Sequence, residues 1–202
     1  MRKISIALGT IAVLAMNSAH SDSYGVIGVS MNSGELKDSI KSSSAQNHDD
    51  ESNTAYFDLG YFVTENIAAE FGYRSFENSE SYTYPTGILS GDAEVDMLKI
   101  GLRGITSRDS SAYAFGGLGV ASITQETTVK TIPTGSSLTV GQKLKKDSVN
   151  VYYSLGAGYR FSESVSLEAS YSDYGKAGDD AGLAKPSERE FSEFAIGLNI
   201  AF

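Results

Sequence analysis

The sequence predicts an all-β protein, an eight-stranded antiparallel up-and-down barrel that crosses a membrane, and three observations support this prediction. Stretches in which apolar and polar residues alternate with period two recur along the chain. The gaps between these stretches alternate between long and short. The last stretch ends the chain on an aromatic residue, Phe202. Alternation with period two places the two sets of side chains on opposite faces of a strand.

The closing stretch, residues 191–202, shows the alternation most clearly. Its apolar face contains Phe194, Ile196, Leu198, Ile200 and Phe202, and its other face contains Glu193, Ala195, Gly197, Asn199 and Ala201. A final strand with an aromatic terminal residue resembles the closing strand and assembly signal of bacterial outer-membrane barrels. The resemblance implies that the barrel assembly machinery recognises the strand that ends at Phe202.

The N-terminus has the layout of a secretory signal peptide. Arg2 and Lys3 precede a mostly apolar run over residues 4–16, and Ala19-His20-Ser21 forms a small-x-small cleavage site. This run is too short to span a membrane as a helix, which needs about twenty residues. We therefore expect residues 1–21 to be a cleaved signal peptide and residues 22–202 to be the barrel. The alternative is a buried N-terminal helix.

Composition excludes several classes of protein. The 202 residues include no Cys, so no disulfide framework, thiolate nucleophile or zinc–thiolate site is available. The formal net charge of -9 argues against nucleic acid as a partner, because nucleic acid favours a basic surface. No segment after the signal peptide is apolar enough over about twenty residues to predict a transmembrane helix.

Eight strands follow from the alternation. They are expected over residues 24–31, 55–63, 67–76, 95–105, 112–123, 149–161, 165–174 and 191–202. Short turns lie at 64–66, 107–110 and 162–164, and long polar gaps run to Thr54, to Ala93, from Thr124 to Asp147 and from Gly175 to Glu190. Outer-membrane barrels have short periplasmic turns, long extracellular loops and an even number of strands. The sequence thus predicts three short turns on the periplasmic side and four long extracellular loops.

The apolar faces are expected to contact lipid. A barrel of eight strands is just wide enough for side chains to fill it, so a large apolar face fits better outside than inside. Two aromatic girdles are predicted, with Tyr61, Tyr113, Tyr159 and Phe202 near the turns and Phe57, Tyr73, Tyr171 and Phe194 near the loops. The register of strand 112–123 stays open, because Tyr113 and Phe115 give way to Gly117 and Gly119 on one face. A soluble periplasmic barrel, or a lipocalin-like barrel with its apolar face turned inward around a ligand, is the alternative.

The inward faces supply the candidate site. They combine four carboxylates with four cations, namely Asp58, Glu70, Glu168 and Glu193 with Arg74, Lys99, Arg103 and Arg160. Buried charges must pair, because an isolated buried ion costs several kcal/mol. The favoured interpretation is a structural network of salt bridges that fills the lumen. The alternative is a gated, narrow path for ions in which these pairs exchange partners.

Other motifs give weak signals for chemistry. His48 would be the only histidine left after cleavage, and it lies in a long polar gap beside Ser, Asp and Glu residues that lack rigid positioning for catalysis. The Asp49-Asp50-Glu51 cluster could bind Ca²⁺ weakly, although a solvated acidic loop is the favoured interpretation. Likewise, Lys143-Leu144-Lys145-Lys146 could contact lipopolysaccharide phosphates or be a solvated loop tip. The Gly116-Gly117-Leu118-Gly119 run fits a barrel wall better than a nucleotide loop. We predict no catalytic residue, cofactor or metal.

The chain resembles small outer-membrane barrels of the OmpA transmembrane-domain and OmpX/Ail type. The resemblance rests on the strand that ends at Phe202, on GYFVTENIAAEFGYR at residues 60–74 and on LGAGYRF at residues 155–161. It implies an outer-membrane protein with lipid and lipopolysaccharide as neighbours, and the luminal charges resemble the interior of the OmpA transmembrane domain. We expect no cell-wall-binding domain and a non-catalytic structural or cell-surface role, with host or surface ligands bound by the loops. A narrow channel is the alternative, followed by a lipid-modifying enzyme.

Overall fold

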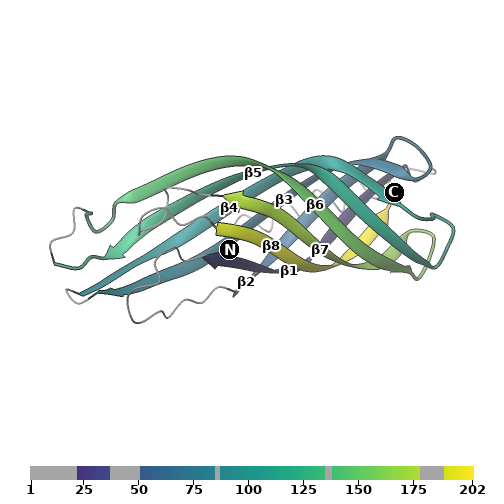
Figure 1. Cartoon of the computed structure of the whole chain (residues 1–202). Helices are drawn as coiled ribbons and strands as arrows, with labels where there is room; N and C mark the ends of the chain where they lie inside the picture. The colour runs from purple at the N-terminus through teal and green to yellow at the C-terminus, as the bar shows by residue number, and fades with distance from the viewer. Residues whose placement is uncertain (1–21, 37–50, 85–86, 135–137, 178–188) are drawn as a thin grey trace.

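A computed structural model describes residues 22–36, 51–84, 87–134, 138–177 and 189–202. These residues form a closed barrel of eight strands, each antiparallel to its neighbours in the sequence (Figure 1). The predicted fold class is confirmed. The strands are β1 (Ser23–Leu36), β2 (Glu51–Phe62), β3 (Ile67–Tyr84), β4 (Gly87–Ile105), β5 (Ala112–Thr131), β6 (Lys143–Arg160), β7 (Val165–Ala177) and β8 (Arg189–Ala201).

Strand β8 closes the barrel by pairing with β1. The register runs from Tyr24 opposite Ala201 to Leu36 opposite Arg189, and the backbone N–H of Phe202 donates to the carbonyl of Ser23 at 2.9 Å. Closure matters because hydrocarbon offers no hydrogen-bonding partner for the backbone of an open edge. Both Ser23 and Ala201 lie at the end of the barrel that carries the three short turns.

Among the described residues, no helix has the length and apolar character needed to cross a membrane.

Two of the predicted long loops are mostly strand, which corrects the predicted loop boundaries. β3 and β4 remain paired up to Tyr84 opposite Gly87, and β5 and β6 remain paired up to Thr128 opposite Lys143. The alternation of apolar and polar residues fails there because both faces contain Ser, Thr and charged residues. Backbone pairing continues regardless, since it does not depend on an apolar face. The other two predicted loops fall largely at residues 37–50 and 178–188, outside the described residues.

The barrel wall splits into two parts at the end opposite the short turns. β2 pairs with β3 only from Tyr56 opposite Arg74, and β6 pairs with β7 only from Tyr153 opposite Asp173. Beyond these points, β3 to β6 continue as a four-stranded sheet, which extends well past the other strands in Figure 1. We call it the projecting sheet and define it as residues 75–84, 87–96, 124–131 and 143–152.

The orientation of β5 corrects one element of the predicted aromatic girdle. Tyr113 and Phe115 are buried, and the outward positions of this part of the strand are Ala112, Ala114 and Gly116. The prediction that Tyr113 belongs to the outward turn-side girdle is therefore wrong. The aromatic rings turn inward because Gly158 and Gly156 lie directly opposite Tyr113 and Phe115 on β6 and leave room in the lumen.

The outer surface shows where the apolar band ends. Leu98 is 47% exposed and the adjacent Lys99 only 4%, as expected for alternate outward and inward positions. At the upper limit of the band, the hydroxyl of Tyr73 donates to Asp96 at 2.6 Å and that of Tyr153 to Asp173 at 2.8 Å. The wall splits at this same level. This agreement has a physical reason, because an open strand edge is tolerated in water but not in lipid.

Candidate site: the charged lumen

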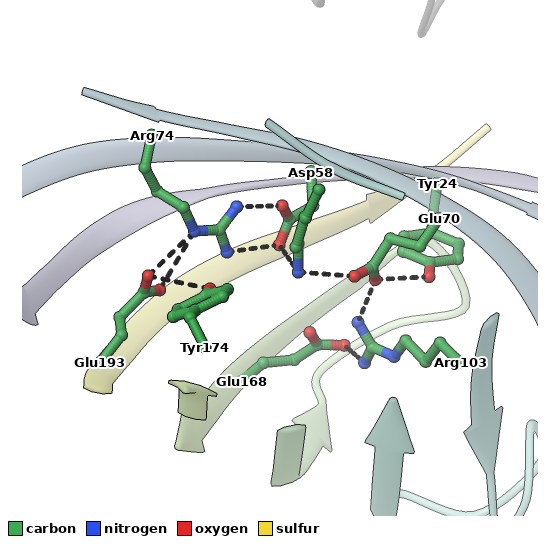
Figure 2. Close-up of polar contacts among 9 residues, drawn as sticks. Tyr24, Asp58, Glu70, Arg74, Arg103, Glu168, Tyr174 and Glu193 are labelled. Carbon is green, nitrogen blue, oxygen red and sulfur yellow. Dashed lines mark hydrogen bonds and ion pairs between the residues drawn. The ribbon is translucent and has the colours of Figure 1, made fainter. Parts of the chain in front are cut away.

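A continuous chain of ion pairs fills the middle of the lumen (Figure 2). It contains every predicted luminal charge except Arg160. We call it the luminal charge chain, and its members alternate in sign. In order of contact they are Glu193, Arg74, Asp58, Lys99, Glu70, Arg103 and Glu168.

Arg74 and Lys99 link the carboxylates nearest the projecting sheet. The Nε of Arg74 lies 3.0 Å from Glu193, and its two terminal nitrogens lie 2.5 and 3.1 Å from the oxygens of Asp58. Lys99 then bridges two acids, with its Nζ 3.1 Å from Asp58 and 2.7 Å from Glu70. The bidentate contact of Arg74 with Asp58 is the strong, orienting geometry for such a pair.

Arg103 continues the chain toward the short turns. Its terminal nitrogens lie 3.4 Å from Glu70 and 2.6 Å from Glu168. The guanidinium also stacks 3.7 Å from the ring centre of Phe115. Its Nε is buried without a hydrogen-bond partner. The planar group is thus held by two acids and an aromatic ring, which restricts its orientation.

Neutral side chains satisfy the remaining carboxylate oxygens. Tyr174 donates to Glu193 at 3.1 Å, and Tyr24 donates to Glu70 at 3.0 Å. Glu168 accepts from both Tyr113 and Asn199 at 2.7 Å. Buried ion pairs are stable only when such additional hydrogen bonds complete them. The tyrosines therefore belong to the site as much as the charges do.

Arg160 lies apart from the luminal charge chain. Its guanidinium donates to the backbone carbonyls of Arg108 and Ser110 and lies 5.0 Å from the ring centre of Tyr113. Among the described residues it forms no ion pair with a luminal carboxylate, so the expected pairing is wrong. The reason is its position near the end of β6, where it reaches the turn between β4 and β5.

Sequence reasoning missed the aromatic residues that fill the lumen. Each of them lies directly opposite a glycine on the neighbouring strand, in the pairs Tyr24–Gly60, Tyr56–Gly28, Tyr113–Gly158, Phe115–Gly156 and Tyr152–Gly119. A Cβ on any of these glycines would overlap the facing ring. Tyr56 shares its face of β2 with Asp58, and Tyr152 shares its face of β6 with Ser154. This shared parity was a signal available in the sequence.

The lumen has a different filling on each side of the charges. Toward the projecting sheet lies a buried apolar layer, formed by Phe76, Val95, Met97, Ala121, Ile123, Tyr152, Tyr174 and Phe191. Toward the short turns lies a cavity of about 820 Å³, whose lining includes Arg103, Glu168 and Arg160. The charges are therefore covered by apolar side chains on one side and face an open vestibule on the other.

The other predicted motifs add no site. Gly116–Gly119 lies within β5, as expected for a barrel wall. His48, Asp49 and Asp50 lie outside the described residues, and the described residues contain no cluster of ligands suited to a metal ion. The basic cluster lies on β6 rather than in a loop tip, and there Lys143 contacts Glu126 at 2.5 Å and Lys145 contacts Asp147 at 3.7 Å.

Comparison with known families agrees with this architecture. Residues 5–202 match the family described as "Outer membrane protein beta-barrel domain". The chain belongs to this family. It is therefore an outer-membrane β-barrel, and its exposed apolar band is the surface that meets lipid. Curated proteins give no match to the chain.

Solved structures of small outer-membrane barrels share the fold. Neisserial surface protein A (NspA) is 14% identical with a TM-score of 0.60, and the match covers 90% of this chain and 98% of NspA. Ail of Yersinia pestis, solved with the heparin analogue sucrose octasulfate, is 12% identical with a TM-score of 0.57 over 91% of this chain and 99% of Ail. OprG of Pseudomonas aeruginosa is 15% identical with a TM-score of 0.56, covering 91% and 97%. At these identities the likeness concerns the fold alone.

Proposed function

We propose that this protein is a non-catalytic outer-membrane barrel that acts at the cell surface through its projecting sheet and the segments that connect the strands at that end. The observation that supports this most is the division of the molecule at the upper limit of the apolar band. Below it, side chains fill the lumen. Above it, a charged sheet extends into water.

The filled lumen argues against the alternative of a narrow channel. A path for ions would have to cross the luminal charge chain and then the apolar layer that contains Met97 and Ile123, both 1% exposed. An apolar constriction excludes water and thereby stops ions. The luminal charge chain thus serves to fill the lumen and to fix the strands in register.

The projecting sheet is suited to contact with partners. Its outward face includes Glu77, Asp92, Glu94, Glu126 and Lys130, all of which would be costly in lipid. Ail, a barrel of the same fold, was solved with a sulfated sugar analogue. In this chain Lys130 lies 2.9 Å from Asp92 and Lys143 lies 2.5 Å from Glu126, so neighbouring carboxylates already neutralise these lysines. A protein surface is therefore the ligand class that we favour over a sulfated glycan.

Export and assembly complete the proposal. Residues 1–21 act as a cleaved signal peptide, and β8, ending beside Phe202, is the strand that the barrel assembly machinery recognises. Lipid surrounds the apolar band, and lipopolysaccharide surrounds the base of the projecting sheet. The basic head, apolar run and small-x-small site support the first point, and the exposed Phe194, Ile196 and Leu198 of β8 support the second.

Shortening the two hairpins of the projecting sheet tests the surface role. Residues 79–92 are replaced by Asn-Gly between the paired Asn78 and Ala93, and residues 128–143 by Asn-Gly between the paired Thr127 and Leu144. Cells that display the full-length or the shortened protein are compared for adhesion to immobilised host-matrix proteins. We expect the shortened protein to assemble, as shown by compact mobility in unheated detergent gels, and to lose adhesion. Equal adhesion after residues 37–50 and 178–188 are also shortened would refute the surface role.

A further inference from the structure

The projecting sheet has two free edges. Residues 75–84 of β3 pair with β4 alone, and residues 143–152 of β6 pair with β5 alone, in the described part of the chain. Such an edge exposes backbone N–H and C=O groups that can pair with another strand. Both edges lie beyond the apolar band, where a partner strand can reach them through water.

A side chain terminates each free edge at its base. The hydroxyl of Thr54 donates to the carbonyl of Ser75, where β2 separates from β3. The amide of Asn150 donates to the carbonyl of Tyr174 at 3.0 Å, where β6 separates from β7. These side-chain bonds replace the next backbone bond of each ladder. The residues farther out along both edges remain available for a different strand.

The two edges carry opposite charge. The β3–β4 hairpin of the projecting sheet contains acids and no Lys or Arg, namely Glu77, Glu80, Asp92, Glu94 and Asp96. In the β5–β6 hairpin the lysines Lys130, Lys143, Lys145 and Lys146 outnumber the acids Glu126 and Asp147. The sheet is thus acidic at one edge and basic at the other, so the two edges are complementary to one another.

The strand directions permit the edges of two molecules to pair. β3 runs away from the short turns and β6 runs toward them. When two barrels stand upright in one membrane, β3 of one molecule beside β6 of another is antiparallel, like every pair within the barrel. We infer that the acidic β3 edge of one copy pairs with the basic β6 edge of a second copy and joins barrels side by side.

The charges also suggest a register for this pairing. Glu77 and Lys145 are both exposed on the outward faces of their strands. A register that places Glu77 opposite Lys145 brings the two charges together on the water-facing surface, where opposite charges across strands are favourable. Lys145 gives up little, because its contact with Asp147 is exposed and 3.7 Å long. Since each copy retains one free acidic and one free basic edge, the pairing generates rings or open rows.

This inference does not rest on the proposed function, since association between copies requires no foreign ligand.

Disulfide cross-linking tests the pairing directly, because the chain has no cysteine of its own. Glu77→Cys and Lys145→Cys proteins are mixed in lipid vesicles and oxidised. We expect a disulfide-linked dimer in the mixture and little in either protein alone, since facing strand positions lie within disulfide range. Glu65→Cys replaces Glu77→Cys as the control, because Glu65 lies in a short turn at the opposite end. Absence of a dimer enriched over this control would overturn the inference.

Charge reversal provides a second test that separates pairing from misfolding. The first variant is Glu77→Lys/Glu80→Lys and the second is Lys145→Glu/Lys146→Glu, and energy transfer between labelled copies in vesicles reports association. Each variant alone is expected to associate about tenfold more weakly than the natural protein, because like charges then meet. A mixture of the two variants restores opposite charges and is expected to recover association. Compact mobility in unheated gels verifies folding, and equal association of all samples would contradict edge pairing.

Discussion

At the scale of single residues, the lumen is governed by how each buried charge is shared. Arg74 contacts both Asp58 and Glu193, Lys99 contacts both Asp58 and Glu70, and Arg103 contacts both Glu70 and Glu168. Because every cation serves two carboxylates, removal of one cation affects two acids at once. The loss of one buried partner is costly because the other remains as an uncompensated ion.

Replacement of Arg74 by Leu tests this sharing. We expect Arg74→Leu to lower the free energy of unfolding by about 3–5 kcal/mol, because Glu193 loses its only cation in the luminal charge chain and Asp58 keeps Lys99 alone. The measurement is urea-induced unfolding of the barrel in lipid vesicles.

Lys130→Ala is the matched control for Arg74→Leu. Lys130 forms an exposed ion pair with Asp92 in the projecting sheet, and such pairs contribute about 0–1 kcal/mol. Equal losses in the two variants would show that burial of the charge chain contributes nothing to stability.

At the scale of strands, glycine and aromatic residues set how closely neighbouring strands fill the lumen. Tyr24 of β1 lies opposite Gly60 of β2, and its ring occupies the space that a side chain at Gly60 would need. The same arrangement recurs between β5 and β6, where Tyr113 faces Gly158. A ring that covers a facing glycine shields the backbone and fixes which residues lie opposite one another.

Gly60→Ala tests the fit between β1 and β2. The added methyl group would overlap the ring of Tyr24, which also donates to Glu70, so the ring and this hydrogen bond must shift together. We expect a loss of about 1–3 kcal/mol in the free energy of unfolding. Gly104→Ala is the control, since its Cβ would meet only the carbonyl of Asn66 at 3.9 Å. If the two alanine variants unfold at the same urea concentration, the pairing of ring and glycine has no role.

Strand length and strand orientation were predicted unequally well from the sequence. The expected cores of β2, β4 and β7 lie within the observed strands, because one face is apolar and the other is not. The outer parts of β3 and β5 were missed, because they contain polar residues on both faces. In β5 the aromatic residues Tyr113 and Phe115 were interpreted as an apolar outward face, yet they face a lumen that glycines had left open.

At the scale of the whole molecule, the barrel is open at one end and filled in the middle. The cavity of about 820 Å³ reaches Arg103 and Glu168 from the side of the short turns. Beyond the luminal charge chain, the apolar layer with Val95, Met97 and Ile123 separates this vestibule from the projecting sheet. Water that enters the vestibule therefore meets first a charged and then an apolar barrier.

Planar-bilayer recordings test whether the molecule conducts. We expect no conductance steps from the natural protein, and none from Glu70→Ala or Arg103→Ala, because the apolar layer stays intact in both variants. Met97→Gly/Ile123→Gly removes two side chains of that layer and is expected to permit brief openings. Regular conductance steps from the natural protein would instead support the channel alternative.

The sequence by itself determined the strand faces, the lipid-facing band and the residues that place charge inside. These properties are local, because side chains alternate along any strand whatever its neighbours are. The tertiary structure decided the rest: that Arg74 bridges Asp58 and Glu193, that Arg160 binds turn carbonyls instead, and that Tyr113 turns inward. These outcomes depend on which residues lie opposite one another, and closure of the barrel sets that register for all strands together.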